Sequence, residues 1–189
     1  MGQAKRHREA ARRDAGLDRE GIARAVRAAV SSRAALAGLS GGLCGFHAAV
    51  GRALLAARFG IRAQLVAGDA QRRVTARVVH SYAGRGGQLD AATGACHVWL
   101  SLPATGAVVD FDAWEEPVRY DATDRPHGPW TGPRPEFYWF GPGETAPGLH
   151  ALRPDRDATA YVEARLAGDS ARRFVEAALA EALARLDAA

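Results

Sequence analysis

The stretch GGLCGFHAAVGRALLAARFGIRAQLVAG, residues 41–68, contains the pattern that decides the predicted fold. Two glycines precede Cys44, and the residues that follow are mainly apolar and helix-forming as far as Phe59. Gly60 is the residue type that most often ends a helix, because glycine adopts the left-handed backbone conformation at no steric cost. We therefore expect a helix over residues 44–59 with a cysteine at its first position.

A second helix is expected before this one. Asp18 can cap it, and Ile22, Val26 and Val30 recur every fourth residue, which places them on one apolar face. The segment LAGLSGG, residues 36–42, then separates the two helices because its three glycines disfavour a continuous helix.

After residue 60 the period changes to that of a β-sheet. Short runs rich in β-branched and aromatic residues alternate with Gly, Asp and Pro, and they predict four strands: 61–68, 74–82, 96–102 and 107–114. Residues 84–95 should form a long hairpin loop. The last two strands are joined by the short turn LPATG, so they should pair antiparallel.

The C-terminal part is expected to begin with an irregular segment and to end in helices. Residues 117–149 are dense in proline and glycine, which favours a chain without regular structure. Two helices should follow, and the second should begin at Ser170 with Asp169 or Ser170 as its cap.

Composition and charge limit the function classes. The chain has 189 residues, 48% of them hydrophobic, which suits one core, and we expect a basic mobile tail over residues 1–16 and a single domain over residues 17–189. The tail has five basic and two acidic residues and so carries three of the four net positive charges. Nucleic acid is therefore not an expected partner. The chain lacks a long apolar run and an N-terminal signal pattern, so we expect no membrane partner and a cytoplasmic location.

Cys44 is the first residue that suggests chemistry. The chain has only two cysteines, too few for a disulfide framework, so free thiols are expected. A helix N-terminus carries partial positive charge and unpaired backbone amides, which stabilise a thiolate and can bind an oxyanion. Position alone therefore predicts a lowered pKa for the Cys44 thiol.

Two further residue types follow on adjacent predicted strands. His97 and Trp99 should share one face of their strand, while Cys96 and Val98 point to the other face. The next strand carries Asp110 and Asp112, and either carboxylate could hold the ring nitrogen that His97 does not offer to a thiol.

This combination resembles the transglutaminase-like superfamily, which has the papain-like cysteine hydrolase fold. Its members have a cysteine that opens an apolar helix ending in Gly-Ile-x-Ala, a strand that begins His-x-Trp, and an acid on the following strand. The corresponding segments here are CGFHAAVGRALLAARFGIRAQLVAG, HVWLSL and VVDFD, within residues 38–114. The resemblance implies an α+β fold in which the helix bearing the cysteine packs on an antiparallel sheet bearing the histidine and the aspartate.

The resemblance also implies a chemistry. Cys44 would be the nucleophile, His97 the general base and Asp110 the orienting acid of a cysteine-dependent amide hydrolase or acyltransferase. The reaction would pass through a thioester formed with a peptide or amide substrate, without a cofactor or a metal. Three features depart from the family pattern. Ser101 stands where an acid is common, and GAVV replaces a tryptophan before the aspartate. In addition, a second acid, Asp112, follows Asp110 where the family usually has a Pro or Thr motif.

Two other functions use the same residues. The departures are compatible with a catalytically degenerate member of the fold that binds a partner without turning it over. Alternatively, a zinc ion could be bound by four side chains: Cys44, His47, Cys96 and His97. Adjacent strand residues point to opposite faces, which makes the geometry of such a site poor.

Overall fold

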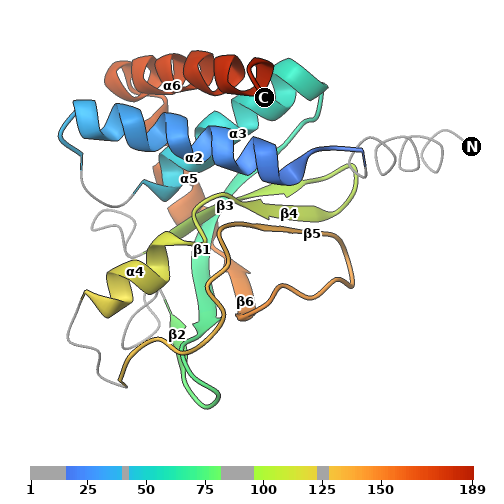
Figure 1. The fold of residues 1–189 in the computed structure, drawn as a ribbon, viewed down its shortest axis with the longest axis vertical. Helices are drawn as coiled ribbons and strands as arrows, with labels where there is room; N and C mark the ends of the chain where they lie inside the picture. The colour runs from blue at the N-terminus through green and yellow to red at the C-terminus, as the bar shows by residue number, and fades with distance from the viewer. Residues whose placement is uncertain (1–15, 40–42, 82–95, 123–127) are drawn as a thin grey trace, which may run out of the picture.

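A computed structural model describes residues 16–39, 43–81, 96–122 and 128–189 of the chain. The predicted long hairpin loop, and all of the predicted basic tail except residue 16, lie outside the described residues. The described part is α+β, with helices gathered mainly on one side of a curled antiparallel sheet (Figure 1).

The helices are α2 (Arg19–Leu36), α3 (Cys44–Phe59), α4 (Glu115–Asp121), α5 (Arg156–Leu166) and α6 (Asp169–Asp187). The first two begin and end where the sequence predicts. The backbone N–H of Gly21 donates to Asp18 Oδ1 over 2.8 Å at the start of α2, and Gly60 ends α3 with a φ of 64°.

The start of α6 differs from the prediction. Its cap is Gly168, whose backbone is extended, and neither Asp169 nor Ser170 caps the helix with its side chain. Asp169 is instead the first helical residue, and its carboxylate accepts a hydrogen bond from Arg172 Nη2 over 2.6 Å. An acid in the first turn stabilises the helix through the macrodipole without acting as the cap.

The strands are β1 (Gln64–Arg73), β2 (Val79–Ser81), β3 (His97–Leu102), β4 (Ala107–Asp110), β5 (Tyr138–Phe140) and β6 (Leu149–Pro154). They lie in the order β2-β1-β3-β4-β5, with β6 also paired to β1, and every one of these pairs is antiparallel. The predicted pairing of the last two strands is confirmed, with Leu100 opposite Val109.

Four predictions for this region need correction. The strand expected at 107–114 ends at Asp110, because the chain turns over residues 111–114. The strand expected at 61–68 begins at Gln64 and continues to Arg73, because β2 and β6 pair with its polar second half. The strand expected at 74–82 shrinks to β2, since the backbone N–H of Val74 donates to the carbonyl of Val78 and closes a turn. The segment 117–149 is not wholly irregular, because α4 continues into it as far as Asp121 and β5 lies within it and pairs with β4.

The main core lies between the helices and one face of the sheet. Helices α2, α3 and α6 lie together over this face, as Figure 1 shows. The helix residues of this core, Val26, Val30, Leu54 and Leu55, are fully buried. They form one cluster with Cys96, which directly precedes β3, and with the strand residues Leu65, Val98, Leu100 and Val109. Since side chains alternate along β3, His97 and Trp99 belong to the opposite face, where α4 contributes to the cover.

Candidate functional site

Cys44 is the first residue of α3 and is half-buried. Helix α3 has no side-chain cap, so the backbone N–H groups of its first turn have no partner within the helix. The expected lowering of the thiol pKa is wrong. Burial raises the pKa of Cys44 well above its ordinary value, and negative charge on Asp112, Cys96, Glu115 and Asp110 raises it further. Desolvation and several nearby anionic groups outweigh half a positive charge from the helix.

Cys44 and His97 approach β3 from different faces. The face of β3 that packs beneath α3 carries Val98 and Leu100, and Cys96 just before the strand packs with them. His97 and Trp99 lie side by side on the other face, with their ring centroids 6.4 Å apart. Each of Cys44 and His97 is the first residue of its element. A proton transferred from the Cys44 thiol to the His97 ring would therefore have to pass the N-terminal end of β3.

His97 and Asp110 form a buried pair. The atoms His97 Nε2 and Asp110 Oδ2 are 2.8 Å apart, and both side chains are almost completely shielded from solvent. The β3–β4 register explains the pairing, because Asp110 follows Val109 on β4 and so lies on the face that carries His97 and Trp99. The second oxygen, Asp110 Oδ1, accepts a hydrogen bond from the backbone N–H of Asp112 over 2.9 Å.

Asp110 is ionised at neutral pH. Burial opposes the charge, but His97 and Arg72 beside the carboxylate outweigh burial and lower its pKa to about 2. An ionised carboxylate only accepts hydrogen bonds, so the hydrogen of neutral His97 must be on Nε2. The other ring nitrogen, Nδ1, is then the acceptor of the ring, which is the tautomer that a general base toward a thiol needs.

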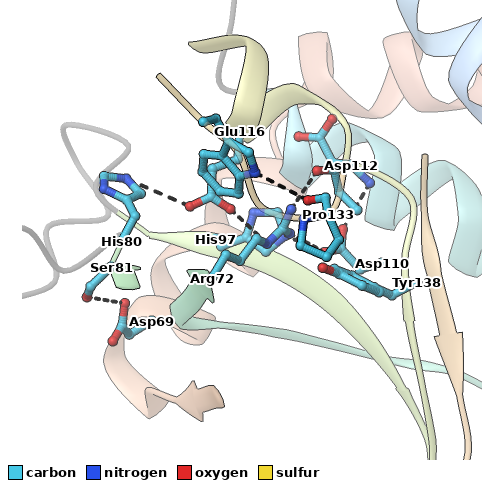
Figure 2. Close-up of polar contacts among 12 residues, drawn as sticks. Asp69, Arg72, His80, Ser81, His97, Asp110, Asp112, Glu116, Pro133 and Tyr138 are labelled. Atoms are coloured by element: carbon cyan, nitrogen blue, oxygen red, sulfur yellow. Dashed lines mark hydrogen bonds and ion pairs between the residues drawn. The ribbon is translucent and has the colours of Figure 1, made fainter. Parts of the chain in front are cut away.

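Arg72 completes the network, and the sequence did not reveal it. Its Nη2 donates to Asp110 Oδ2 over 2.6 Å, and its Nη1 donates to the carbonyl of Ala113 over 2.6 Å. The Nε lies 2.7 Å from Glu116 Oε2, and the guanidinium lies over the Tyr138 ring with 5.2 Å between Cζ and the ring centroid (Figure 2). Residues 69–73 lay between two expected strands, and no local signal distinguishes Arg72 from Arg73.

Glu116 differs from Asp110 although both contact Arg72. Burial raises the pKa of Glu116 to about 8, against the lowering influence of Arg72. His80 on β2 lies on the other side of Glu116, with 3.8 Å between its Nε2 and Glu116 Oε1 (Figure 2). At neutral pH Glu116 is therefore mainly the neutral acid, and Asp110 is the anion that balances Arg72.

Asp112 does not share the position of Asp110. Strand β4 ends at Asp110, and the chain then turns, so Asp112 Oδ1 lies 3.2 Å from Nδ1 of His47 on α3. Burial, Glu115 and Asp110 raise the pKa of Asp112 well above its ordinary value. Burial also lowers the pKa of His47 to about 4. The structure thus contains a second buried His–Asp pair, which forms on the helix side of the sheet.

The zinc alternative finds no support in the described residues. Among them no three His, Cys, Asp or Glu side chains form a group that could hold a metal ion. The alternation of β3 accounts for this, since Cys96 and His97 face opposite sides of the sheet. Within the same residues, no helix combines the length and the apolar character that crossing a membrane requires.

Comparisons with known proteins extend to the fold alone. No protein-family model and no curated protein matches the chain. A solved structure described only as the crystal structure of genomics APC5867 is similar, with a TM-score of 0.61 and 16% sequence identity over 86% of this chain and 78% of that chain. At this identity the similarity supports the α+β arrangement and carries no information about activity.

Proposed function

We propose that the protein is a cysteine-dependent amide hydrolase or acyltransferase in which Cys44 is the nucleophile, His97 the general base and Asp110 the orienting acid. The observation that carries the proposal is the buried contact between His97 Nε2 and Asp110 Oδ2. Buried carboxylates with a strongly shifted pKa are concentrated at functional sites, and this one could orient the His97 imidazole toward a nucleophile.

The chemistry follows from the groups present. Nδ1 of His97 takes the thiol proton as Cys44 Sγ attacks the carbonyl carbon of an amide. The backbone N–H groups at the start of α3 stabilise the oxyanion. Collapse of the tetrahedral intermediate breaks the C–N bond, and His97 returns its proton to the leaving amine, which leaves a thioester on Cys44. Water then completes hydrolysis, or a second amine completes acyl transfer.

The raised pKa of Cys44 determines how the first step proceeds. At neutral pH the resting group is a thiol, so the proton must be removed while the carbonyl is attacked. The imidazolium formed on His97 is then stabilised by Asp110, which lies 2.8 Å from Nε2. This mechanism differs from that of proteases whose cysteine rests as a thiolate.

A second candidate, a binding module without turnover, is favoured by two observations. The thiol pKa is raised rather than lowered, and Cys44 lies with Cys96 on the helix side of β3 while His97 lies on the other side. In that case the buried His–Asp pair would stabilise the domain, and the partner would be bound elsewhere on the surface.

Acylation of the protein separates the two candidates. The protein is mixed with p-nitrophenyl acetate, and intact-mass measurement and peptide mapping locate the acetyl group. The enzyme proposal expects acetylation at Cys44 and a loss of about 100-fold or more in its rate in His97→Gln. His47→Gln and Cys96→Ala are the matched controls, since each alters a buried residue of the same type, and both should retain the rate. Equal Cys44 acetylation in wild type and in folded His97→Gln would favour the binding module.

A further inference from the structure

We propose that Arg72 is a positioning residue that selects the tautomer of His97 by keeping Asp110 an anion. The inference rests on the proposed function for its catalytic meaning, but its physical content concerns only the three side chains. Figure 2 shows Arg72 and His97 together between Asp110 and Glu116. The guanidinium contacts the Asp110 carboxylate, the carbonyl of Ala113 and the Glu116 carboxyl group, so three contacts fix its position.

Asp110 Oδ2 is the atom that both His97 and Arg72 contact. It accepts from His97 Nε2 over 2.8 Å and from Arg72 Nη2 over 2.6 Å. Arg72 Nη2 also lies 3.1 Å from His97 Nε2, but a guanidinium only donates, and Nε2 already carries the hydrogen that it gives to Asp110. Arg72 therefore acts on the ring through the shared oxygen and does not bond to the ring itself.

The consequence of removing the cation follows from burial. Asp110 is 1% exposed, and without Arg72 only His97 and the backbone N–H of Asp112 would oppose the desolvation of its charge, so its pKa should rise. A neutral carboxylic acid has a hydrogen to donate, and it can donate this hydrogen to Nε2. The hydrogen of the ring would then move to Nδ1, and Nδ1 could no longer accept a proton from a thiol.

The double variant Arg72→Gln/Glu116→Gln tests this, because it removes the cation that balances Asp110 together with the acid that Arg72 Nε contacts. Histidine labelled with ¹⁵N reports the tautomer directly, and the His97 signals are identified by their loss in His97→Gln. At pH 7 wild type should show hydrogen on Nε2, whereas the double variant should show a predominant Nδ1–H form that reverts as the pH is raised and Asp110 ionises. Glu116→Gln alone and Arg72→Lys should both retain Nε2–H. A wild-type tautomer in the folded double variant would overturn the proposal.

A measurement on the unaltered protein covers the case in which the double variant does not fold. The ¹³Cγ shift of Asp110 should be that of a carboxylate at pH 4.5, and a protonated Asp110 at this pH would overturn the proposal. Activity keeps the two proposals distinct. If acetylation of Cys44 depends on His97, the double variant should lose about 100-fold in rate at pH 7 and recover part of the loss at pH 9. If the double variant shows the altered tautomer but wild type shows no acetylation at Cys44, the role of Arg72 stands and the enzyme proposal is wrong.

Discussion

The two buried His–Asp pairs of this protein have the same residue types, but the pKa values of their two carboxyl groups shift in opposite directions. Asp110 contacts His97 beside Arg72 and has a pKa of about 2, whereas Asp112 contacts His47 beside Glu115 and has a raised pKa. Only Phe111 separates the two acids in the chain. The difference shows that burial raises the pKa of both carboxyl groups, and that the surrounding charges, His97 and Arg72 for Asp110 but Glu115 for Asp112, determine the direction of the net shift.

Replacing each aspartate by asparagine should give the largest difference in stability between the two pairs. Asp110→Asn removes the anion from a buried ion pair and leaves Arg72 under-compensated, so we expect a loss of about 3 kcal/mol or more in the free energy of unfolding. Asp112→Asn replaces an acid whose ionised form is already disfavoured, and should change the free energy by no more than about 1 kcal/mol. Urea unfolding at pH 7 measures both, and equal losses would remove the distinction between the pairs.

The two pairs should also lose their contributions to stability in different pH ranges. The pKa of His47 is about 4 in the folded protein, whereas an ordinary histidine has a pKa of 6.5. Between these two pH values the unfolded chain binds a proton at His47 and the folded chain does not. The resulting stability is present above pH 6.5 and is lost as the pH falls toward 4, by about 3 kcal/mol in total.

The Asp110 contribution should be lost at lower pH. Its native pKa is about 2 against an ordinary 3.8, so this contribution is present above pH 3.8 and disappears as the pH falls toward 2. In His47→Gln the decline between pH 6.5 and 4 should flatten, while the acid transition below pH 4 persists. A His47→Gln curve parallel to that of wild type between pH 6.5 and 4 would contradict the assignment.

Phe111 should matter as the spacer between the two acids. It is almost fully buried, and a Cβ added at Gly51 of α3 would lie 2.1 Å from its Cε2 atom. Gly51→Ala should therefore cost about 2 kcal/mol of unfolding free energy through overpacking. Gly45→Ala is the matched control on the same helix, since its Cβ would meet Val162 at 3.6 Å, an ordinary contact, and should be neutral or slightly stabilising. Similar stability for both variants would show that Phe111 relaxes freely.

The smallest effect concerns the thiol. Negative charge on Asp112 raises the pKa of Cys44, so Asp112→Asn should lower that pKa and speed alkylation by iodoacetamide about three- to tenfold near pH 8. Asp157→Asn, an exposed acid of α5, serves as the control and should leave the rate unchanged. The rate is followed from pH 7 to pH 10, and an unchanged profile in Asp112→Asn would show that Asp112 does not act on Cys44.

Local signals were sufficient for several elements. Asp18 and Gly60 mark the ends of helices α2 and α3, and the LPATG turn pairs β3 with β4. From that pairing Asp110 could be named as a possible partner of His97, because residues near a hairpin turn have their register determined by the turn. By contrast, β5 and β6 have weak patterns of their own and become strands only by pairing with β4 and β1.

The sequence by itself determined where the thiol, the imidazole and the carboxylates lie along the chain, and which of them begin a helix or a strand. Only the tertiary structure decided that Arg72 reaches Asp110, that Asp112 turns to His47, and that the thiol pKa rises. Helix caps and hairpins involve residues near one another in sequence and therefore have local signatures. Charge states depend on burial and on neighbours many residues away, such as Arg72 and Asp110, and no local pattern records those distances.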